Sequence, residues 1–211
     1  MKGNIKRLAV FVMIAAIAMF MAVATASAQP TYFYPIRGHY AVTGAGNNLV
    51  STTGFDKNYN PNPCPTPAPP FGCLVFQDIQ ILQGDFILNA DGTGTFTELN
   101  RGIDSPPLSY NIKVGTYDFI YTKTSAQRFT YHLKPGTYLK VDFIAGGQTG
   151  QTIYFEGDGF CEGVLSADWQ NLNVTCGPPN MIFTAVDPST GTKLPIQALL
   201  TQSVVGIRVN E

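Results

Sequence analysis

Residues 160–176 read FCEGVLSADWQNLNVTC, and this stretch predicts a β-hairpin. Its two halves alternate in steps of two on either side of a loop at residues 167–170, which is typical of paired antiparallel strands. With that loop, the register places Cys161 directly opposite Cys176, where cross-strand distances suit a disulfide. The stretch therefore predicts an antiparallel β protein in which a disulfide staples one hairpin.

The chain has four cysteines, and sequence position favours the pairs Cys64–Cys73 and Cys161–Cys176. Residues 56–72 contain six prolines and predict a surface loop, since proline disrupts both helices and sheet ladders. The first disulfide would close this loop, so we expect a Pro-rich, disulfide-closed loop at 56–73. A zinc site is not expected, because the chain lacks a C-x-x-C motif and its two histidines are far from the cysteines in sequence. We expect neither a metal site nor a cofactor.

Elsewhere the chain also alternates in steps of two, and helix periodicity is nearly absent. Further strands are expected near residues 85–90, 94–99, 117–121, 129–133, 139–143, 153–157, 181–186 and 197–209. Tight-turn signals such as Ala90-Asp91-Gly92-Thr93 join them. About eight to ten short strands without crossover helices predict an antiparallel up-and-down meander that closes into a barrel, because closure removes both exposed edges. A two-sheet β-sandwich is the alternative.

The N-terminal residues predict a signal peptide over residues 1–28. Lys2, Lys6 and Arg7 precede an apolar run of 17 residues, and Ala26-Ser27-Ala28 then forms a cleavage site. The expected mature chain, residues 29–211, has the length of a single domain and would be periplasmic or secreted without a membrane span. It carries 10 basic and 14 acidic side chains, a net charge of −4, which argues against a nucleic-acid partner.

Three short motifs resemble the lipocalin-like, or calycin, class of small exported β-barrels. Gly38-His39-Tyr40 is similar to the G-x-W that opens the first lipocalin strand, with Tyr40 in the place of the tryptophan. The hairpin at 86–94 and the late hairpin at 163–168, followed by Arg208, complete the resemblance. The resemblance implies that Tyr40 and Arg208 form the pair that closes one end of the barrel, and that the barrel holds a small ligand.

Aromatic residues at strand spacing are the candidates for lining a ligand cavity, or alternatively for filling a packed core. They are Tyr117, Phe119, Tyr121, Phe129, Tyr131, Phe143 and Phe155. Both histidines, His39 and His132, alternate with inward-facing neighbours and should face solvent. Trp169 lies at a predicted hairpin tip, where it either anchors a partner or folds back onto the end of the barrel.

No residue set predicts catalysis. A small acidic cluster, Glu156, Asp158 and Glu162, is explained more simply by an exposed sheet edge than by a cation site. We therefore expect a non-enzymatic barrel that binds a small apolar molecule or lipid, with no protein partner identified. One alternative is a structural or protein-interaction module that uses the 56–73 loop and the hairpin tips. The other is a cyclase-like or isomerase-like barrel enzyme, which would need titratable groups such as His39 or Asp118 inside.

Overall fold

The computed structural model describes residues 36–68, 72–105, 109–157, 160–177 and 182–209. The predicted signal peptide and its cleavage site lie outside these residues. Within them, no helix has the length and apolar character that crossing a bilayer would require.

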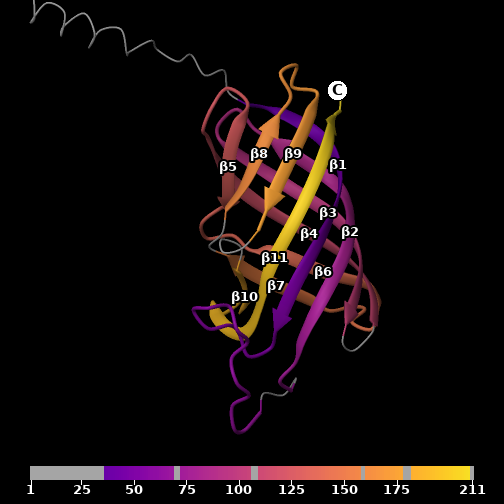
Figure 1. The fold of residues 1–211 in the computed structure, drawn as a ribbon, viewed down its shortest axis with the longest axis vertical. Helices are drawn as coiled ribbons and strands as arrows, with labels where there is room; N and C mark the ends of the chain where they lie inside the picture. Colours follow the sequence, from indigo (N-terminus) through magenta and orange to yellow (C-terminus); the bar gives the residue numbers. More distant parts are fainter. Residues whose placement is uncertain (1–35, 69–71, 106–108, 158–159, 178–181, 210–211) are drawn as a thin grey trace, which may run out of the picture. The chain divides into compact units, whose positions relative to one another are not determined.

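The described residues form eleven β-strands, which are all antiparallel to their neighbours (Figure 1). Their bounds are β1 Gly38–Ser51, β2 Val75–Leu88, β3 Thr93–Ser105, β4 Ser109–Lys123, β5 Arg128–Leu133, β6 Leu139–Gly146, β7 Thr152–Gly157, β8 Phe160–Leu165, β9 Asn171–Cys176, β10 Ile182–Asp187 and β11 Thr192–Arg208.

The sheet closes on itself at two levels. The five long strands, β11, β1, β2, β3 and β4, lie side by side in that order. Near one end of these strands β5, β8 and β9 bridge β4 back to β11, and near the other end β6, β7 and β10 do the same. Figure 1 shows the two sets of short strands at opposite ends of the long ones. Each level is a ring of eight antiparallel strands, so the predicted antiparallel all-β sheet that closes on itself is confirmed, with eleven strands in the described residues instead of the predicted eight to ten.

The hairpin over residues 160–176 has the predicted register. In the β8–β9 pair, Cys161 lies opposite Cys176 and Leu165 lies opposite Leu172. The structure contains both disulfides that sequence position favoured, Cys64–Cys73 and Cys161–Cys176. The second one fixes the wall of the barrel where β5, β8 and β9 form it.

The interior of the ring that contains β5, β8 and β9 is a packed aromatic core. Phe86, Phe96, Phe119, Phe129 and Tyr131 are all almost completely buried. The ring centroids of Phe119 and Tyr131 are 4.7 Å apart, and those of Phe86 and Phe119 are 4.8 Å apart, within the range of favourable aromatic packing. This end of the barrel is therefore filled by its own side chains.

Along β2 and β3, the inward-facing side chains change from aromatic to polar at the same level. On β2 the buried series runs from Phe86 and Leu82 to polar side chains, and on β3 it runs from Phe96 to polar side chains in the same way. We call this set the polar layer. It comprises Asn48, Asp78, Gln80, Glu98, Asn100, Asp104, Asn111, Lys113 and Gln202. The polar layer separates the aromatic core from the other half of the barrel.

Candidate ligand-binding site

Beyond the polar layer, the barrel encloses a cavity of about 560 Å³. One side of its lining is apolar and comes mainly from β6, β7, β10 and β11, which belong to the ring without the aromatic core. These apolar side chains are Leu139, Val141, Phe143, Ile153, Phe155, Phe183, Val186, Leu194, Ile196, Ala198 and Leu200. The far end is lined by Tyr117 and by members of the polar layer. Several residues at the opposite end, such as Leu74 and Leu194, are exposed, so the cavity opens to solvent there.

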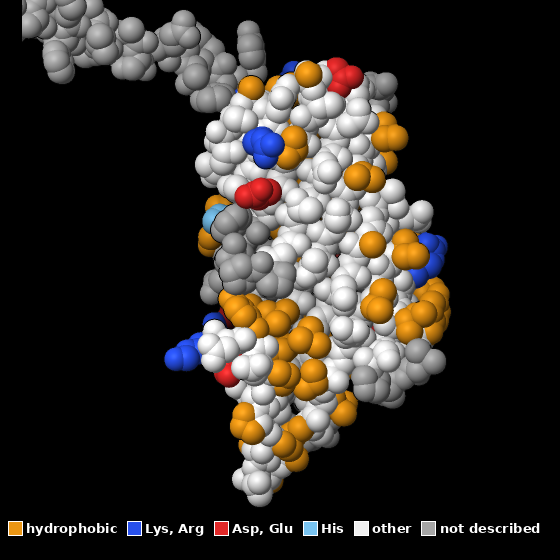
Figure 2. All heavy atoms as spheres, in the orientation of Figure 1, with side chains coloured by type: hydrophobic (Ala, Val, Ile, Leu, Met, Phe, Trp, Pro, Cys, Tyr) orange, Lys and Arg blue, Asp and Glu red, His pale blue; other side chains and the backbone are white. Residues whose placement is uncertain are grey.

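Hydrophobic side chains also gather on the surface at this end. Figure 2 shows hydrophobic side chains gathered over the lower part of the visible face, near β10 and the start of β11. Exposed apolar residues around a cavity mouth are typical of a ligand entrance.

A buried ion pair forms one part of the polar layer. Lys113 on β4 donates to the Oδ2 atom of Asp78 on β2, and both side chains are almost completely buried. Asn48 Nδ2 donates to the same Oδ2 atom at 3.0 Å. The Lys113 ammonium also lies 5.9 Å from the ring centroid of Phe143, which is a favourable cation–π distance. Lys113 is therefore held by groups of the protein itself.

Glu98 on β3 is the second charged group of the layer. Its Oε1 atom accepts from Asn100 Nδ2 and its Oε2 atom accepts from Gln202 Nε2, each at 2.8 Å. Two accepted hydrogen bonds suit an ionised carboxylate. Burial nevertheless raises the pKa of Glu98, although these two hydrogen bonds and the charge of Lys113 oppose the increase.

Asp104, further along β3, is the third carboxylate. Its Oδ2 atom accepts from Ser109 Oγ at 3.2 Å and from Asn111 Nδ2 at 3.0 Å. Burial raises the pKa of Asp104, and the nearby carboxylate of Asp78 raises it further. Three carboxylates and one ammonium thus share the barrel interior.

Several oxygens of the polar layer have no hydrogen-bond partner among the residues that the structure describes. They are Asn48 Oδ1, Asp78 Oδ1, Gln80 Oε1, Asn100 Oδ1 and Asn111 Oδ1. All of these residues except Asn111 line the cavity. An unpartnered buried polar atom costs about 1–3 kcal/mol, and a ligand or solvent in the cavity can remove that cost. The side chains that line the cavity therefore carry unused acceptor oxygens, which are themselves buried.

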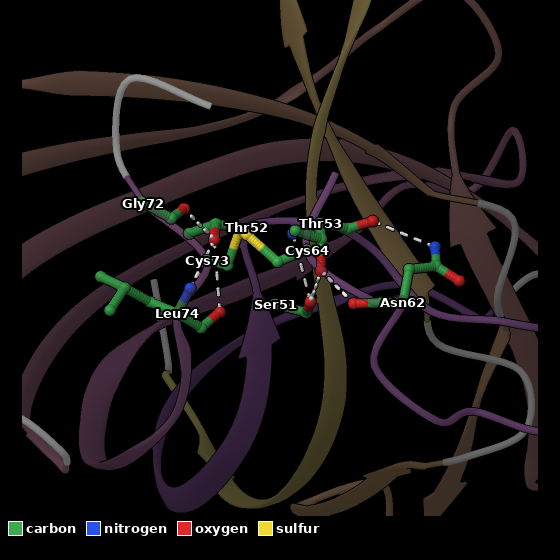
Figure 3. Close-up of a disulfide and its surroundings, with 8 residues drawn as sticks. All are labelled: Ser51, Thr52, Thr53, Asn62, Cys64, Gly72, Cys73 and Leu74. Carbon is green, nitrogen blue, oxygen red and sulfur yellow. Dashed lines mark hydrogen bonds between the residues drawn. A yellow bond between two sulfur atoms is a disulfide. The ribbon is translucent and has the colours of Figure 1, made fainter. Parts of the chain in front are cut away.

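The rim of the cavity carries the Pro-rich loop between β1 and β2, which is drawn in Figure 3. Thr52 and Leu74 both line the cavity. The Thr52 backbone N–H donates to the Leu74 carbonyl at 3.0 Å, and Thr52 Oγ1 donates to the Gly72 carbonyl at 2.8 Å. Beside them, the Cys64–Cys73 disulfide joins the two arms of the loop. The loop is therefore fastened to the open end of the barrel.

The sequence-predicted cavity residues divide between the cavity and the core. Tyr117, Phe143 and Phe155 line the cavity. Phe119, Phe129 and Tyr131 belong to the aromatic core, and Tyr121 packs against it. The aromatic pattern alone does not separate these two environments, because both lie on the inward face of the same strands.

Tyr40 and Arg208 lie opposite each other where β1 pairs with β11. Tyr40 is fully buried in the aromatic core, and its hydroxyl donates to the Trp169 carbonyl at 3.1 Å. The Trp169 side chain itself packs against the aromatic core. Trp169 therefore covers the filled end of the barrel, as expected if it folds back.

The described histidines and acidic residues that the sequence offered as possible catalytic or cation-binding groups lie on the outside of the barrel. His39 pairs with Asp85 at 2.7 Å, and Asp118 and His132 are exposed. Asp142 accepts from Lys140, and Glu156 from Lys193. Glu162 is exposed, whereas Asp158 lies outside the described residues. No cluster of metal-ligating side chains occurs in the described ranges.

The sequence pattern did not predict the polar layer, because polar residues face inward there and apolar residues face outward. On β2, Asp78 and Gln80 face inward, whereas Ile79 and Ile81 are 55% and 64% exposed on the outside. Apolar alternation alone would place the isoleucines inside. The available signal was the strict spacing of polar residues by two, at positions 78 and 80 and again at 98 and 100.

Comparisons with known proteins place few constraints on this chain. No protein-family model and no curated protein sequence matches it. The crystal structure of Neisserial surface protein A is similar, with a TM-score of 0.46 and 12% sequence identity over 82% of this chain and 97% of that chain. The cavity itself therefore carries the functional conclusion.

Proposed function

We propose that this chain is an exported, lipocalin-like barrel that binds one small amphipathic molecule. The observation that carries the proposal is the cavity of about 560 Å³, whose apolar wall ends on the polar layer. Ligand sites of about 300–1,000 Å³ with mostly apolar walls and a few polar groups are typical of small-molecule binding proteins. An apolar body would lie against the side chains of β6, β7, β10 and β11.

The contrast between the two halves of the barrel supports this proposal. Eight-stranded barrels are either filled by their own side chains or hold one small ligand. Here the aromatic core fills one half, while the other half keeps a cavity that opens at the end opposite the core. The filled half would act as a rigid base, and the second ring would supply the binding walls.

The two disulfides support an exported location. Disulfides persist in oxidising compartments such as the periplasm or the extracellular space, and all four cysteines are paired in this structure. Export would also fit the predicted signal peptide, and the periplasm or the medium would be the place where ligand is captured.

The proposal is tested by filling the cavity from the wall. Ala198 on β11 lines the cavity, whereas Thr201 on the same strand is exposed on the outside. Decan-1-ol, titrated into the purified protein by calorimetry, should bind at one site. We expect Ala198→Trp to weaken binding by more than roughly tenfold, and Thr201→Trp to leave it unchanged.

Circular dichroism and thermal unfolding of both variants establish that each one still folds. If the folded Ala198→Trp variant binds decanol as tightly as the unmodified protein does, the cavity is not the binding site. If the unmodified protein shows no saturable binding of decan-1-ol, decylamine or decanoate, the proposed function is overturned.

A further inference from the structure

The charges that line the cavity are strongly unequal. Among the described lining residues, the carboxylates are Asp78, Glu98 and Asp104 in the polar layer and Asp187 at the rim, and Lys113 is the cation. The carboxyl groups of the polar layer accept hydrogen bonds from neighbouring side chains, and burial raises the pKa of Glu98 and Asp104. Because Lys113 is already paired with Asp78, the lining holds more carboxyl groups than cations, and a cation bound beside Glu98 and Asp104 would favour their ionised forms.

The unpartnered atoms of the layer have the same polarity. Asn48 and Asn100 each donate through Nδ2 to a carboxylate, at 3.0 Å and 2.8 Å. A carboxylate accepts but does not donate, so these bonds fix the amide orientation and leave each Oδ1 atom without a donor. Asp78 Oδ1 is also unpartnered, and it belongs to a side chain that is 97% buried. The layer thus offers unpartnered acceptor oxygens.

We propose that the ligand of this cavity carries a cationic, hydrogen-bond-donating head group of the alkylammonium class, which docks on the polar layer at Asp78, Glu98 and Asn100. The inference rests on the proposed function, because it concerns the head group of the same amphipathic ligand. An ammonium group has three donors and no acceptor, which matches the unpartnered oxygens. Its charge offsets the excess of carboxylates, and hydrogen bonds to charged groups are about twice as strong as neutral ones.

A ligand with an anionic head group would be disfavoured for two reasons. A carboxylate in this position would lie beside the carboxyl groups of Glu98 and Asp104 and would raise their pKa further, whereas a cation would lower it. It would also leave the unpartnered acceptor oxygens without donors, because one acceptor cannot satisfy another. An alcohol would satisfy one oxygen through its single donor but would not offset the charge.

Three probes with the same ten-carbon chain separate the contributions of tail and head. Decylamine, decan-1-ol and decanoate are titrated into the purified protein by calorimetry at pH 7.5, below their micelle concentrations. We expect decylamine to bind roughly tenfold or more tightly than decanol, and decanoate to bind more weakly than decanol.

Two outcomes distinguish the head-group inference from the cavity proposal. If decanol binds saturably and decanoate binds as tightly as decylamine, the head-group inference is overturned and the cavity proposal stands. Equal affinities for decylamine and decanol would also overturn the head-group inference and leave the cavity proposal standing. The absence of saturable binding for all three probes would overturn the cavity proposal itself.

A charge-removing pair of variants localises the recognition. Glu98→Gln removes one carboxylate from the polar layer, and Asp118→Asn removes one from the exposed face of β4. The readout is the ratio of decylamine to decanol affinity, which a loss of packing or folding alone would not change. We expect the ratio to fall about threefold or more in Glu98→Gln and to stay constant in Asp118→Asn. Equal ratios in both variants would show that Glu98 does not recognise the head group.

Discussion

Glycines in the barrel wall make the room that the polar layer needs. Gly102 faces Asn111 across the β3–β4 pair, and Gly115 faces Glu98. A Cβ atom at Gly102 would lie 2.7 Å from Asp78 Oδ1, and one at Gly115 would lie 2.9 Å from Glu98 Oε1. Real carbon–oxygen contacts are not this short, so a larger residue at either position would displace a buried polar side chain. The polar layer therefore depends on small residues in the neighbouring strand.

This dependence predicts the effect of Gly115→Ala. The new methyl group would push the Glu98 carboxylate away from Asn100 or Gln202, and overpacking of a buried site typically costs about 1–3 kcal/mol. We expect a lower free energy of unfolding in urea and weaker decylamine binding. Gly147→Ala is the matched control, because a Cβ at Gly147 has no heavy atom within 4 Å. Equal stability of the two variants would show that Glu98 adjusts without cost.

The buried carboxylate of Glu98 also predicts a pH dependence of stability. Burial raises its pKa in the folded protein, and the titratable groups around it are Asp78 on β2, Lys113 and Tyr117 on β4, and Tyr131 on β5. The folded state therefore binds this proton more tightly than the unfolded state does. Stability from this group is present below the unfolded pKa and is lost as the pH rises through the higher folded pKa.

Glu98→Gln removes that titration. The melting temperature of the variant minus that of the unmodified protein should therefore increase as the pH rises from 4 to 8. Differential scanning calorimetry at several pH values measures the difference. Asp118→Asn, which alters an exposed carboxylate on β4, provides the comparison. A Glu98→Gln difference that is constant over this range would contradict the raised pKa of Glu98 in the folded state.

At the scale of elements, the two disulfides hold different structures. Cys161 and Cys176 are buried in the aromatic core and join β8 to β9, whereas Cys64 is exposed on the rim loop. Closing a loop of about 15 residues is worth about 3 kcal/mol in the chain-entropy description. Removing the buried bridge additionally leaves a cavity in a packed region.

We therefore expect the double variant Cys161→Ala/Cys176→Ala to lose about 3–5 kcal/mol of unfolding free energy. Cys64→Ala/Cys73→Ala should lose less, because its bridge contributes little to the core. Urea unfolding followed by near-UV circular dichroism measures both losses. Equal losses would mean that the packing around Cys161 and Cys176 adds nothing beyond the closure of the loop.

Local elements were predictable wherever apolar residues face inward. The β8–β9 hairpin, its register and both disulfides follow from alternation and sequence position, and Asp91 does accept from the Thr93 N–H in the expected turn. The first halves of β2 and β4 were not predicted. There the inward positions are polar and Ile79, Ile81 and Tyr110 face outward, so the alternation that marks a strand has the opposite sense.

The candidate site was predictable only in part for the same reason. Tyr117, Phe143 and Phe155 follow from inward aromatic spacing, but the contacts of the polar layer are between different strands. Lys113 and Asp78 are 35 residues apart, and Glu98 and Gln202 are 104 residues apart. No local pattern contains such pairs. The two-level closure likewise depends on non-local pairing of β4 with β6 and of β7 with β10.

At the scale of the whole barrel, the two rings should differ in stability. β5, β8 and β9 cover the aromatic core, in which most inward side chains are fully buried. β6, β7 and β10 cover the cavity, and most side chains of β7 are only partly buried. Segments with fewer buried apolar contacts open at lower free energy. The same five long strands thus support one rigid ring and one that opens more readily.

Native-state hydrogen exchange should resolve this difference strand by strand. We expect the amides of β6, β7 and β10 to exchange roughly tenfold or more faster than those of β5, β8 and β9. Decylamine should slow exchange mainly in the first set, because ligand binding stabilises the elements that contact it. The amides of β8 and β9 act as the internal reference, since they lie on the far side of the polar layer. Faster exchange in β8 and β9 than in β6 and β7, or uniform protection by decylamine, would show that the barrel opens as one unit and that the cavity wall is no more mobile than the core.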